Sequence, residues 1–167
     1  MASDSDRQWL KRSAFHYLGQ RSSSTENLRR VLNRRAKKRF KDEALEGVSE
    51  LIDSVVAFCV NNGLVDDGVY AETKVASGAR IGVSRRKLSA KLASKGISRE
   101  IIGNAVSELD DEASAILFAK RRKLGPWRVD QSTRDVQKDT AILARAGFPV
   151  SVAMRTANLR LDDILEE

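Results

Sequence analysis

The sequence predicts an all-α protein, built as an elongated, curved array of three tandem three-helix repeats. Three observations lead to this prediction. The chain has 167 residues with 41% apolar content but only 2 Pro and 10 Gly, a composition that favours helices around a sizeable core. Nine segments carry apolar residues at helical spacing between capping residues. A short pattern also recurs 51 residues further along the chain.

The first repeat, residues 1–64, is expected to hold three helices. The first helix ends near Gly19, and Ser24 or Thr25 caps the second. The third ends at Gly63, in the position of a left-handed C-cap. The apolar residues of the three helices are, in order, Trp9, Leu10, Ala14, Tyr17 and Leu18; Leu28, Val31 and Leu32; and Leu45, Val48, Ile52, Val55 and Cys59.

The second repeat, residues 65–109, is expected to follow the same plan. Asp66 or Asp67 caps its first helix, Ser84 caps the second, and Ser98 begins the third after Gly96 has closed the second. The residues expected to face the core are Val69, Tyr70, Thr73 and Ala76; Leu88 and Leu92; and Ile101, Ile102, Ala105 and Val106.

The third repeat, residues 110–167, begins with an acidic run, 110–112, that suits the N-terminus of a helix. This helix continues through the basic run 120–123 toward Gly125 and Pro126. The next helix spans roughly Thr133 to Ala146, and Pro149 opens the last at its first helical position. The expected apolar residues are Ala113, Ile116 and Leu117, then Val152, Ala153 and Ala157, with a short terminal turn at Leu161, Ile164 and Leu165.

An internal repeat supports the division into three. The segment from Leu92 to Ser98 recurs as the segment from Leu143 to Pro149. In both copies a helix ends at glycine, an apolar residue folds back on it, and a new helix starts. Single units of this size bury little apolar surface, so neighbouring units are expected to stack. Chance repetition in a chain rich in Ala, Leu and Lys is the alternative.

Positive charge is concentrated in the first quarter of the chain. The net charge is +7 and the pI is near 9.8. Residues 1–41 hold 12 Lys or Arg against 3 Asp or Glu, a net charge of +9, whereas the rest holds 18 against 20, a net charge of −2. This distribution indicates a polyanionic partner. A solvated basic helix kept for solubility is the alternative.

No constellation of residues indicates catalysis, and we expect neither an enzyme nor a cofactor or metal. His16 is the only histidine and Cys59 the only cysteine, and both are expected to pack against neighbouring residues. The segment 78–82 lacks the spacing of a phosphate loop, and the pairs of adjacent aspartates fit helix caps. The first residues lack the blocks of a signal peptide, and no apolar run approaches the ~18–20 residues of a membrane span. We therefore expect a cytoplasmic protein.

A set of residues spread along nearly the whole chain carries a family resemblance. The residues are Ala14, Tyr17, Leu18, Arg21, Ser24, Leu28–Arg30 and Leu32; Gly63–Asp67, Tyr70, Ala71, Arg80, Gly82, Leu88, Leu92 and Lys95–Ile97; and Asp110–Ala119, Lys138, Leu143 and Ala146–Phe148. In this order and spacing they resemble the RecX family, regulators of the RecA recombinase. Two positions depart from the family: Arg145 and Ala146 stand where two basic residues are common, and Pro149 replaces a serine cap.

The resemblance implies a negative regulator in homologous recombination, DNA repair and the SOS response. Such a protein binds the RecA–DNA filament in its groove or at its end and inhibits its ATPase, strand-exchange and co-protease activities. We expect a nucleoid-associated monomer that binds single- and double-stranded DNA independently of sequence. The expected binding residues for RecA and DNA are Arg29, Arg30, Arg34, Arg35, Lys37, Lys38, Arg85, Arg86, Lys87, Lys91, Lys120, Arg121, Arg122 and Lys123.

Two alternatives come from other functional classes. A sequence-specific helix-turn-helix DNA-binding protein would use Arg85, Arg86 and Lys87 at the start of a recognition helix. A helical adaptor that binds only protein would bind DNA weakly even at low salt.

Overall fold

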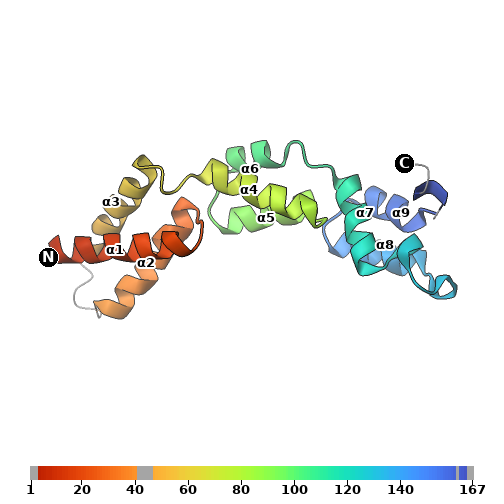
Figure 1. The fold of residues 1–167 in the computed structure, drawn as a ribbon, viewed down its shortest axis with the longest axis horizontal. Coiled ribbons are helices and arrows are strands. Elements are labelled where there is room, and N and C mark those ends of the chain that lie inside the picture. The colour runs from red at the N-terminus through yellow and green to blue at the C-terminus, as the bar shows by residue number, and fades with distance from the viewer. Residues whose placement is uncertain (1–3, 41–46, 161, 165–167) are drawn as a thin grey trace. The chain divides into compact units, whose positions relative to one another are not determined.

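The computed structural model describes residues 4–40, 47–160 and 162–164, and all regular structure in these residues is helical (Figure 1). The all-α prediction is therefore confirmed. The α-helices are α1 Asp4–Gln20, α2 Thr25–Arg39, α3 Val48–Asn61, α4 Asp67–Arg80, α5 Arg85–Ser94, α6 Arg99–Val106, α7 Asp111–Arg122, α8 Val136–Arg145 and α9 Val150–Asn158. Short 3₁₀ helices are η2 Gly125–Trp127, η3 Gln131–Thr133 and η4 Asp162–Ile164.

The chain divides into two compact units. Unit 1 comprises Met1–Ala71 and Leu92–Ile101, and unit 2 comprises Glu72–Lys91 and Ile102–Glu167. The boundary between them passes through α4, α5 and α6. The repeats at 1–64, 65–109 and 110–167, and their stacking into a curved array, stay predictions.

In unit 1, α1, α2 and α3 pack around one apolar core (Figure 1). The expected apolar residues lie in this core or pack against it, apart from Val31, which is buried but not part of this cluster, and Leu45, which falls outside the described residues. The edge of the core is closed by Trp9 and Phe40, whose rings meet edge to face at 5.5 Å between centroids. Gly63 ends the last turn after α3 with a φ of +69°, and Leu64 N–H donates to the Cys59 carbonyl oxygen at 2.9 Å. This left-handed ending matches the sequence prediction.

In unit 2, α7, α8 and α9 pack closely because small residues line the contact. Ala115 and Ala119 of α7 are buried against α9 residues such as Ala153, and the Phe118 and Phe148 rings meet at 5.7 Å between centroids. The apolar residues by which the sequence marked α7 lie outside its buried face: Ala113 lies at the surface, and Ile116 and Leu117 are 37% and 43% exposed.

The predicted core face of α4 is partly wrong. Val69 is 59% exposed, and Thr73 and Ala76 lie at the surface. The buried face runs through Tyr70, Ala71, Val75 and Gly78. Small residues form part of both buried faces, Ala71 and Gly78 in α4 and Ala115 and Ala119 in α7, so a pattern based only on the larger apolar side chains points to a different side of the helix.

Two helix starts differ from the prediction. Helix α8 begins at Val136 and not near Thr133, because Asp135 accepts the Lys138 N–H at 3.0 Å and caps the helix there. Pro149 is the N-cap of α9, with extended backbone angles, and not its first helical residue. Of the predicted terminal turn, Ile164 ends η4, and Leu161 and Leu165 lie outside the described residues.

Within unit 1, the start of α2 is joined to the turn between α5 and α6, and we call this contact the first joint. The Ser24 hydroxyl accepts the Asn27 N–H as the cap of α2 and donates to the Lys95 carbonyl oxygen at 2.5 Å. The next amide, Thr25 N–H, donates to the Asp67 carboxylate at 2.8 Å. Asp66 is the residue that caps α4, through the Val69 N–H at 3.0 Å.

Within unit 2, the start of α5 makes the same contacts with the turn between α8 and α9, which we call the second joint. The Ser84 hydroxyl donates to the Ala146 carbonyl oxygen at 2.8 Å and accepts the Lys87 N–H at 3.3 Å. Arg85 N–H donates to the Asp111 carboxylate at 2.8 Å. Both joints thus use a serine cap and a carboxylate from the start of another helix.

A glycine with positive φ forms the turn at each joint. Gly96 has a φ of +77° and Gly147 a φ of +99°. A Cβ atom on Gly96 would lie 2.4 Å from Glu26 side-chain atoms, and one on Gly147 would lie 2.5 Å from the Ser84 hydroxyl. The repeated glycine is therefore required both by backbone conformation and by close packing across the joint.

Candidate nucleic-acid interface

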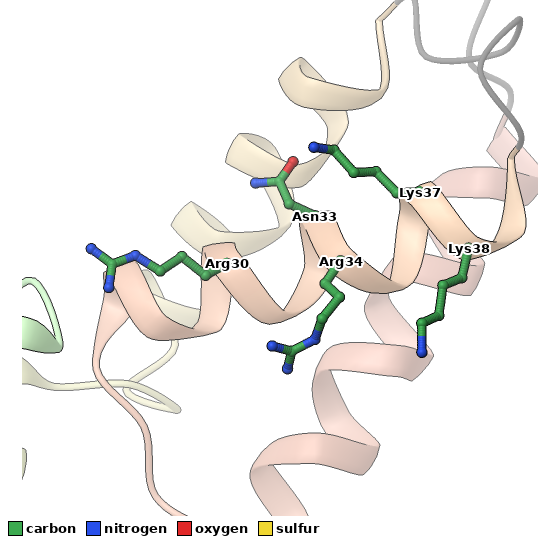
Figure 2. A pocket seen from close by; sticks show the side chains of 5 residues that line it. All are labelled: Arg30, Asn33, Arg34, Lys37 and Lys38. Atoms are coloured by element: carbon green, nitrogen blue, oxygen red, sulfur yellow. The ribbon is translucent and has the colours of Figure 1, made fainter.

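The basic residues of α2 lie outside the apolar side of the helix. The apolar side, with Leu28, Leu32 and Ala36, is buried in the core of unit 1. Side chains spaced three or four residues apart on another side extend outward and line a hollow of about 490 Å³ (Figure 2). They are Arg30, Asn33, Arg34, Lys37 and Lys38.

Two of the expected binding residues on α2 are paired within the protein. Glu26 accepts hydrogen bonds from Arg29 at 2.7 Å and from Arg30 at 3.1 Å, and Arg29 also reaches Asp53 at 2.8 Å. The hydrogen bond from Arg29 is the main cause that lowers the pKa of Glu26, and the bond to Asp53 is the main cause that raises the pKa of Arg29. Arg30 further donates to the Ser94 carbonyl oxygen at 2.7 Å, across the first joint.

Arg35 also holds the fold together. Its guanidinium donates to the Ser13 carbonyl oxygen at 2.8 Å and lies 5.6 Å from the centre of the Tyr17 ring. This places Arg35 between α2 and α1, with its donors directed at the protein. Part of the hydrogen-bonding capacity of Arg35 is therefore used inside the protein, and its role on a binding surface stays a prediction.

Arg34, Lys37 and Lys38 differ from these arginines. Each is exposed, and none has a hydrogen bond or ion pair within residues 4–40, 47–160 and 162–164. Among the six expected binding residues of α2, these three retain the charge and the donors that an anionic partner needs.

The expected binding residues of α5 divide in the same way. Arg85 donates through its guanidinium to the carbonyl oxygen of Leu109, and so secures the segment before α7. Arg86 and Lys87 are exposed, and their side chains line a second hollow beside residues 144–147. Lys91 is exposed but has an interaction within the protein.

Four consecutive cations end α7. Lys120, Arg121, Arg122 and Lys123 are all exposed, and in the described part of the chain none has an ion pair or a side-chain hydrogen bond. Cations at a helix C-terminus are stabilised by the helix dipole, which accounts for their position without a ligand. They still present the densest run of exposed positive charge in unit 2.

Comparison with known proteins places the chain in a family. A model of the second three-helix domain of RecX matches residues 66–106. The regulatory protein RecX of Agrobacterium fabrum is 33% identical over 163 residues, which cover 95% of this chain and 89% of the relative. The chain belongs to the RecX family. The RecX of Myxococcus xanthus is 34% identical over 155 residues, covering 88% and 83%, and that of Streptomyces coelicolor is 31% identical over 147 residues, covering 84% and 73%.

The chain has one histidine, His16, and one cysteine, Cys59. Among the residues that the structure describes, no group of three or more His, Cys, Asp or Glu could hold a metal ion. His16 lies on the exposed side of α1 beside Gln20. Cys59 lies in the core, where burial raises the pKa of its thiol. None of the described helices is long and apolar enough to cross a bilayer.

The structure adds two charged residues, Asp139 and Arg145, that were not among the expected site residues. Asp139 is fully buried in α8, where it pairs with Arg128 at 2.6 Å and accepts the Gly125 N–H at 2.8 Å. Asp139 is the fourth residue of α8 and lies on the same side of the helix as Val136 and Leu143, where the sequence pattern gives no sign that a charge is buried. Arg145 lies exposed beside the second hollow; its position two residues before Gly147 was the only signal for it.

Proposed function

We propose that this chain is a negative regulator of RecA that acts by binding and not by catalysis. It binds the RecA–DNA filament, in its groove or at its end, and inhibits the ATPase, strand-exchange and co-protease activities. Family membership supports this role, because the relatives are named regulatory protein RecX. The observation that carries the binding mode is the set of exposed cations without intramolecular partners in the described residues of three helices, α2, α5 and α7.

The arrangement of these cations favours contact with the DNA backbone over reading of base sequence. Lysine and arginine side chains bind phosphates wherever they lie along a strand, and such contacts carry no sequence information. A helix-turn-helix reader would instead place several base-reading side chains on one helix. Arg85, the first residue of α5, donates to the Leu109 carbonyl oxygen and is directed away from that task.

On this proposal the protein is a cytoplasmic, nucleoid-associated monomer that binds single- and double-stranded DNA. Its net charge of +7 supplies the long-range attraction to DNA. Light scattering of the purified protein tests the monomer, and a dimer at micromolar concentration would contradict it.

The decisive experiment is a RecA ATPase assay on single-stranded DNA with this protein titrated in. We expect the rate to fall with increasing protein, and the concentration needed for half inhibition to rise with salt. A parallel titration of DNA without RecA measures direct binding. If RecA activity is unchanged in excess protein, the regulator proposal fails. Weak DNA binding at low salt would favour the protein-only adaptor instead.

A further inference from the structure

The hollow at the second joint is a distinct site within unit 2. It measures about 430 Å³, within the range of ligand pockets, and is lined by Arg86, Lys87 and Ala90 of α5 and by residues 144–147. We call it the joint hollow. The cations that line it are Arg86, Lys87 and Arg145; all three are exposed, and none of these side chains has an ion pair within the described residues.

The first joint shows what occupies the equivalent place in unit 1. Counting from the capping serines Ser24 and Ser84, Glu26 corresponds to Arg86 and Arg30 to Ala90. At the first joint Arg30 pairs with Glu26 and donates to the Ser94 carbonyl oxygen at 2.7 Å. The cation there is therefore used inside the protein.

The residues that precede the turn glycines also differ between the two joints. Lys95, which precedes Gly96, donates to the Asn27 side chain at 3.3 Å and so bridges the first joint. At the second joint Ala146 takes that place before Gly147, and Lys87 takes the place of Asn27. Side chains that fill and neutralise the first joint are thus replaced at the second by alanines and additional cations.

The positive charge at the joint hollow is not balanced by its own lining. None of the described residues that line it is acidic, and Asp111, the carboxylate of this joint, already accepts the Arg85 N–H at 2.8 Å. Two arginines and a lysine from two helices converge on a space that alanines leave open. Arginine binds phosphate oxygens in pairs, and lysine adds a point charge, so this donor set suits a phosphate group.

We propose that the joint hollow binds one backbone phosphate of a nucleic acid strand. Arg86 from α5 and Arg145 from α8 donate to the two non-bridging oxygens, and Lys87 adds positive charge. Ala90 and Ala146 leave room for the attached sugars to approach. This inference deepens the proposed function, on which it rests, by assigning one phosphate contact to a defined place.

The test places a carboxylate in the hollow and compares it with a matched control. Ala90→Glu puts negative charge one turn from Arg86 and within the lining. Ala113→Glu makes the same substitution at an exposed position of α7, in the same unit and outside the lining. Both variants change the net charge equally, so a general electrostatic effect weakens both alike. Circular dichroism and thermal unfolding establish that both are folded.

The readout is the affinity for a fluorescent oligo-dT strand over a range of salt concentrations. We expect Ala90→Glu to bind roughly ten-fold more weakly, as for removal of a charge-assisted hydrogen bond, and the slope of log affinity against log salt to fall by ~0.7. Ala113→Glu is expected to change affinity less than about two-fold. Equal losses of affinity in the two variants overturn the inference.

Inorganic phosphate and the RecA assay separate the remaining possibilities. If phosphate alone shifts the amide NMR signals of Ala90 and Gly147 while oligo-dT affinity is unchanged in Ala90→Glu, the hollow takes a free anion and the inference is wrong. If Ala90→Glu loses DNA affinity but the parent protein leaves RecA unaffected, the inference on the hollow holds and the proposed function fails. If the parent inhibits RecA and both variants bind DNA with equal affinity, the proposed function stands and the inference on the hollow fails.

Discussion

At the scale of single residues, the cations of α2 have different tasks although they are chemically similar. Arg29 and Arg35 are bound to Asp53 and to the Ser13 carbonyl oxygen, and they stabilise the packing of α2 on α3 and α1. Arg34, Lys37 and Lys38 are exposed without such partners in the described residues. Which cation is used internally depends on which acceptor lies opposite, and that is set by the packing of three helices.

This division leads to a first prediction, for the variant with Arg34, Lys37 and Lys38 all changed to Gln. We expect its free energy of unfolding to stay within ~0.5 kcal/mol of the parent, because exposed side chains without partners contribute little. DNA affinity should fall, and the salt slope on single strands should decrease by ~0.7 for each phosphate that these side chains no longer neutralise. Urea unfolding and DNA titrations measure the two quantities.

Arg35→Gln serves as the contrasting variant. The change removes a partly buried charged donor from the Ser13 carbonyl oxygen, so the free energy of unfolding should fall by about 1–3 kcal/mol. DNA affinity of the folded protein should change little. If the triple variant binds DNA as well as the parent at every salt concentration, its residues form a solvated surface and no interface.

Glu26 is the subject of a second prediction, on the pH dependence of stability. Hydrogen bonds from Arg29 and Arg30 lower the pKa of Glu26 in the folded protein. A lowered folded-state pKa stabilises the protein above the unfolded value of 4.5, and this contribution is lost as pH falls through the folded-state pKa. In Glu26→Gln the acid limb of the stability curve should therefore be flatter below about pH 4.5. Urea titrations between about pH 3 and pH 7 measure it; an unchanged acid limb would show that Glu26 does not contribute.

At the scale of elements, the ends of α2, α5 and α8 depend on which residue lies four positions after a buried leucine. Ala36 follows Leu32 at this distance and α2 continues to Arg39, whereas Gly96 follows Leu92 and Gly147 follows Leu143, and α5 and α8 end. Helix α2 consequently has 15 residues and α5 and α8 have 10 each. The additional residues include Lys37 and Lys38.

A third prediction concerns the joint glycines. Gly96→Ala and Gly147→Ala should each lower the free energy of unfolding by more than about 1 kcal/mol, because the φ is positive and the new Cβ meets the opposite helix. Gly103→Ala is the control, since it lies in α6 with nothing within 4 Å of the added Cβ. That change should stabilise the protein by about 0.4–1 kcal/mol. Equal effects at all three positions would contradict the close packing of the joints.

At the scale of the whole molecule, the net positive charge lies in residues 1–41, but exposed cations without partners in the described residues also occur later in the chain. The first 41 residues carry a net charge of +9, but two of their arginines, Arg29 and Arg30, are paired with carboxylates. The C-terminal end of α7 carries four exposed cations, 120–123. Residues 42–167 nevertheless have a net charge of −2, because they contain slightly more acidic than basic residues. A partner that contacts both regions would be held at two separate places.

This distribution leads to a fourth prediction, on the change of all four residues 120–123 to Gln. We expect weaker inhibition of the RecA ATPase, and a larger decrease when the change is combined with the triple change in α2, because two anchoring regions act together. The difference in the concentration needed for half inhibition should be largest at low salt and should shrink as salt screens the charges. Inhibition curves at several salt concentrations are the measurement. If the combined variant inhibits as well as the parent, the binding surface lies among uncharged residues.

The family was predicted from residues spread along nearly the whole chain, whereas the helical class and most helix limits followed from local patterns. These patterns act over a few residues: apolar spacing, serine and aspartate caps such as Ser84 and Asp110, and glycines at left-handed turns. Residues 120–123 are exposed, as is usual for a run of four cations, and their role in binding stays a prediction.

Which cations are available and where the core faces lie depend instead on the packing of distant segments. Arg85 and Arg35 bind carbonyl oxygens that are 24 and 22 residues away in the chain, and no local pattern reports such distances. The buried faces of α4 and α7 include small residues such as Ala71, Ala115 and Ala119, because closely packed helices leave little room for large side chains. The joint hollow likewise exists because alanines meet cations from α5 and α8, two helices that are far apart in the sequence.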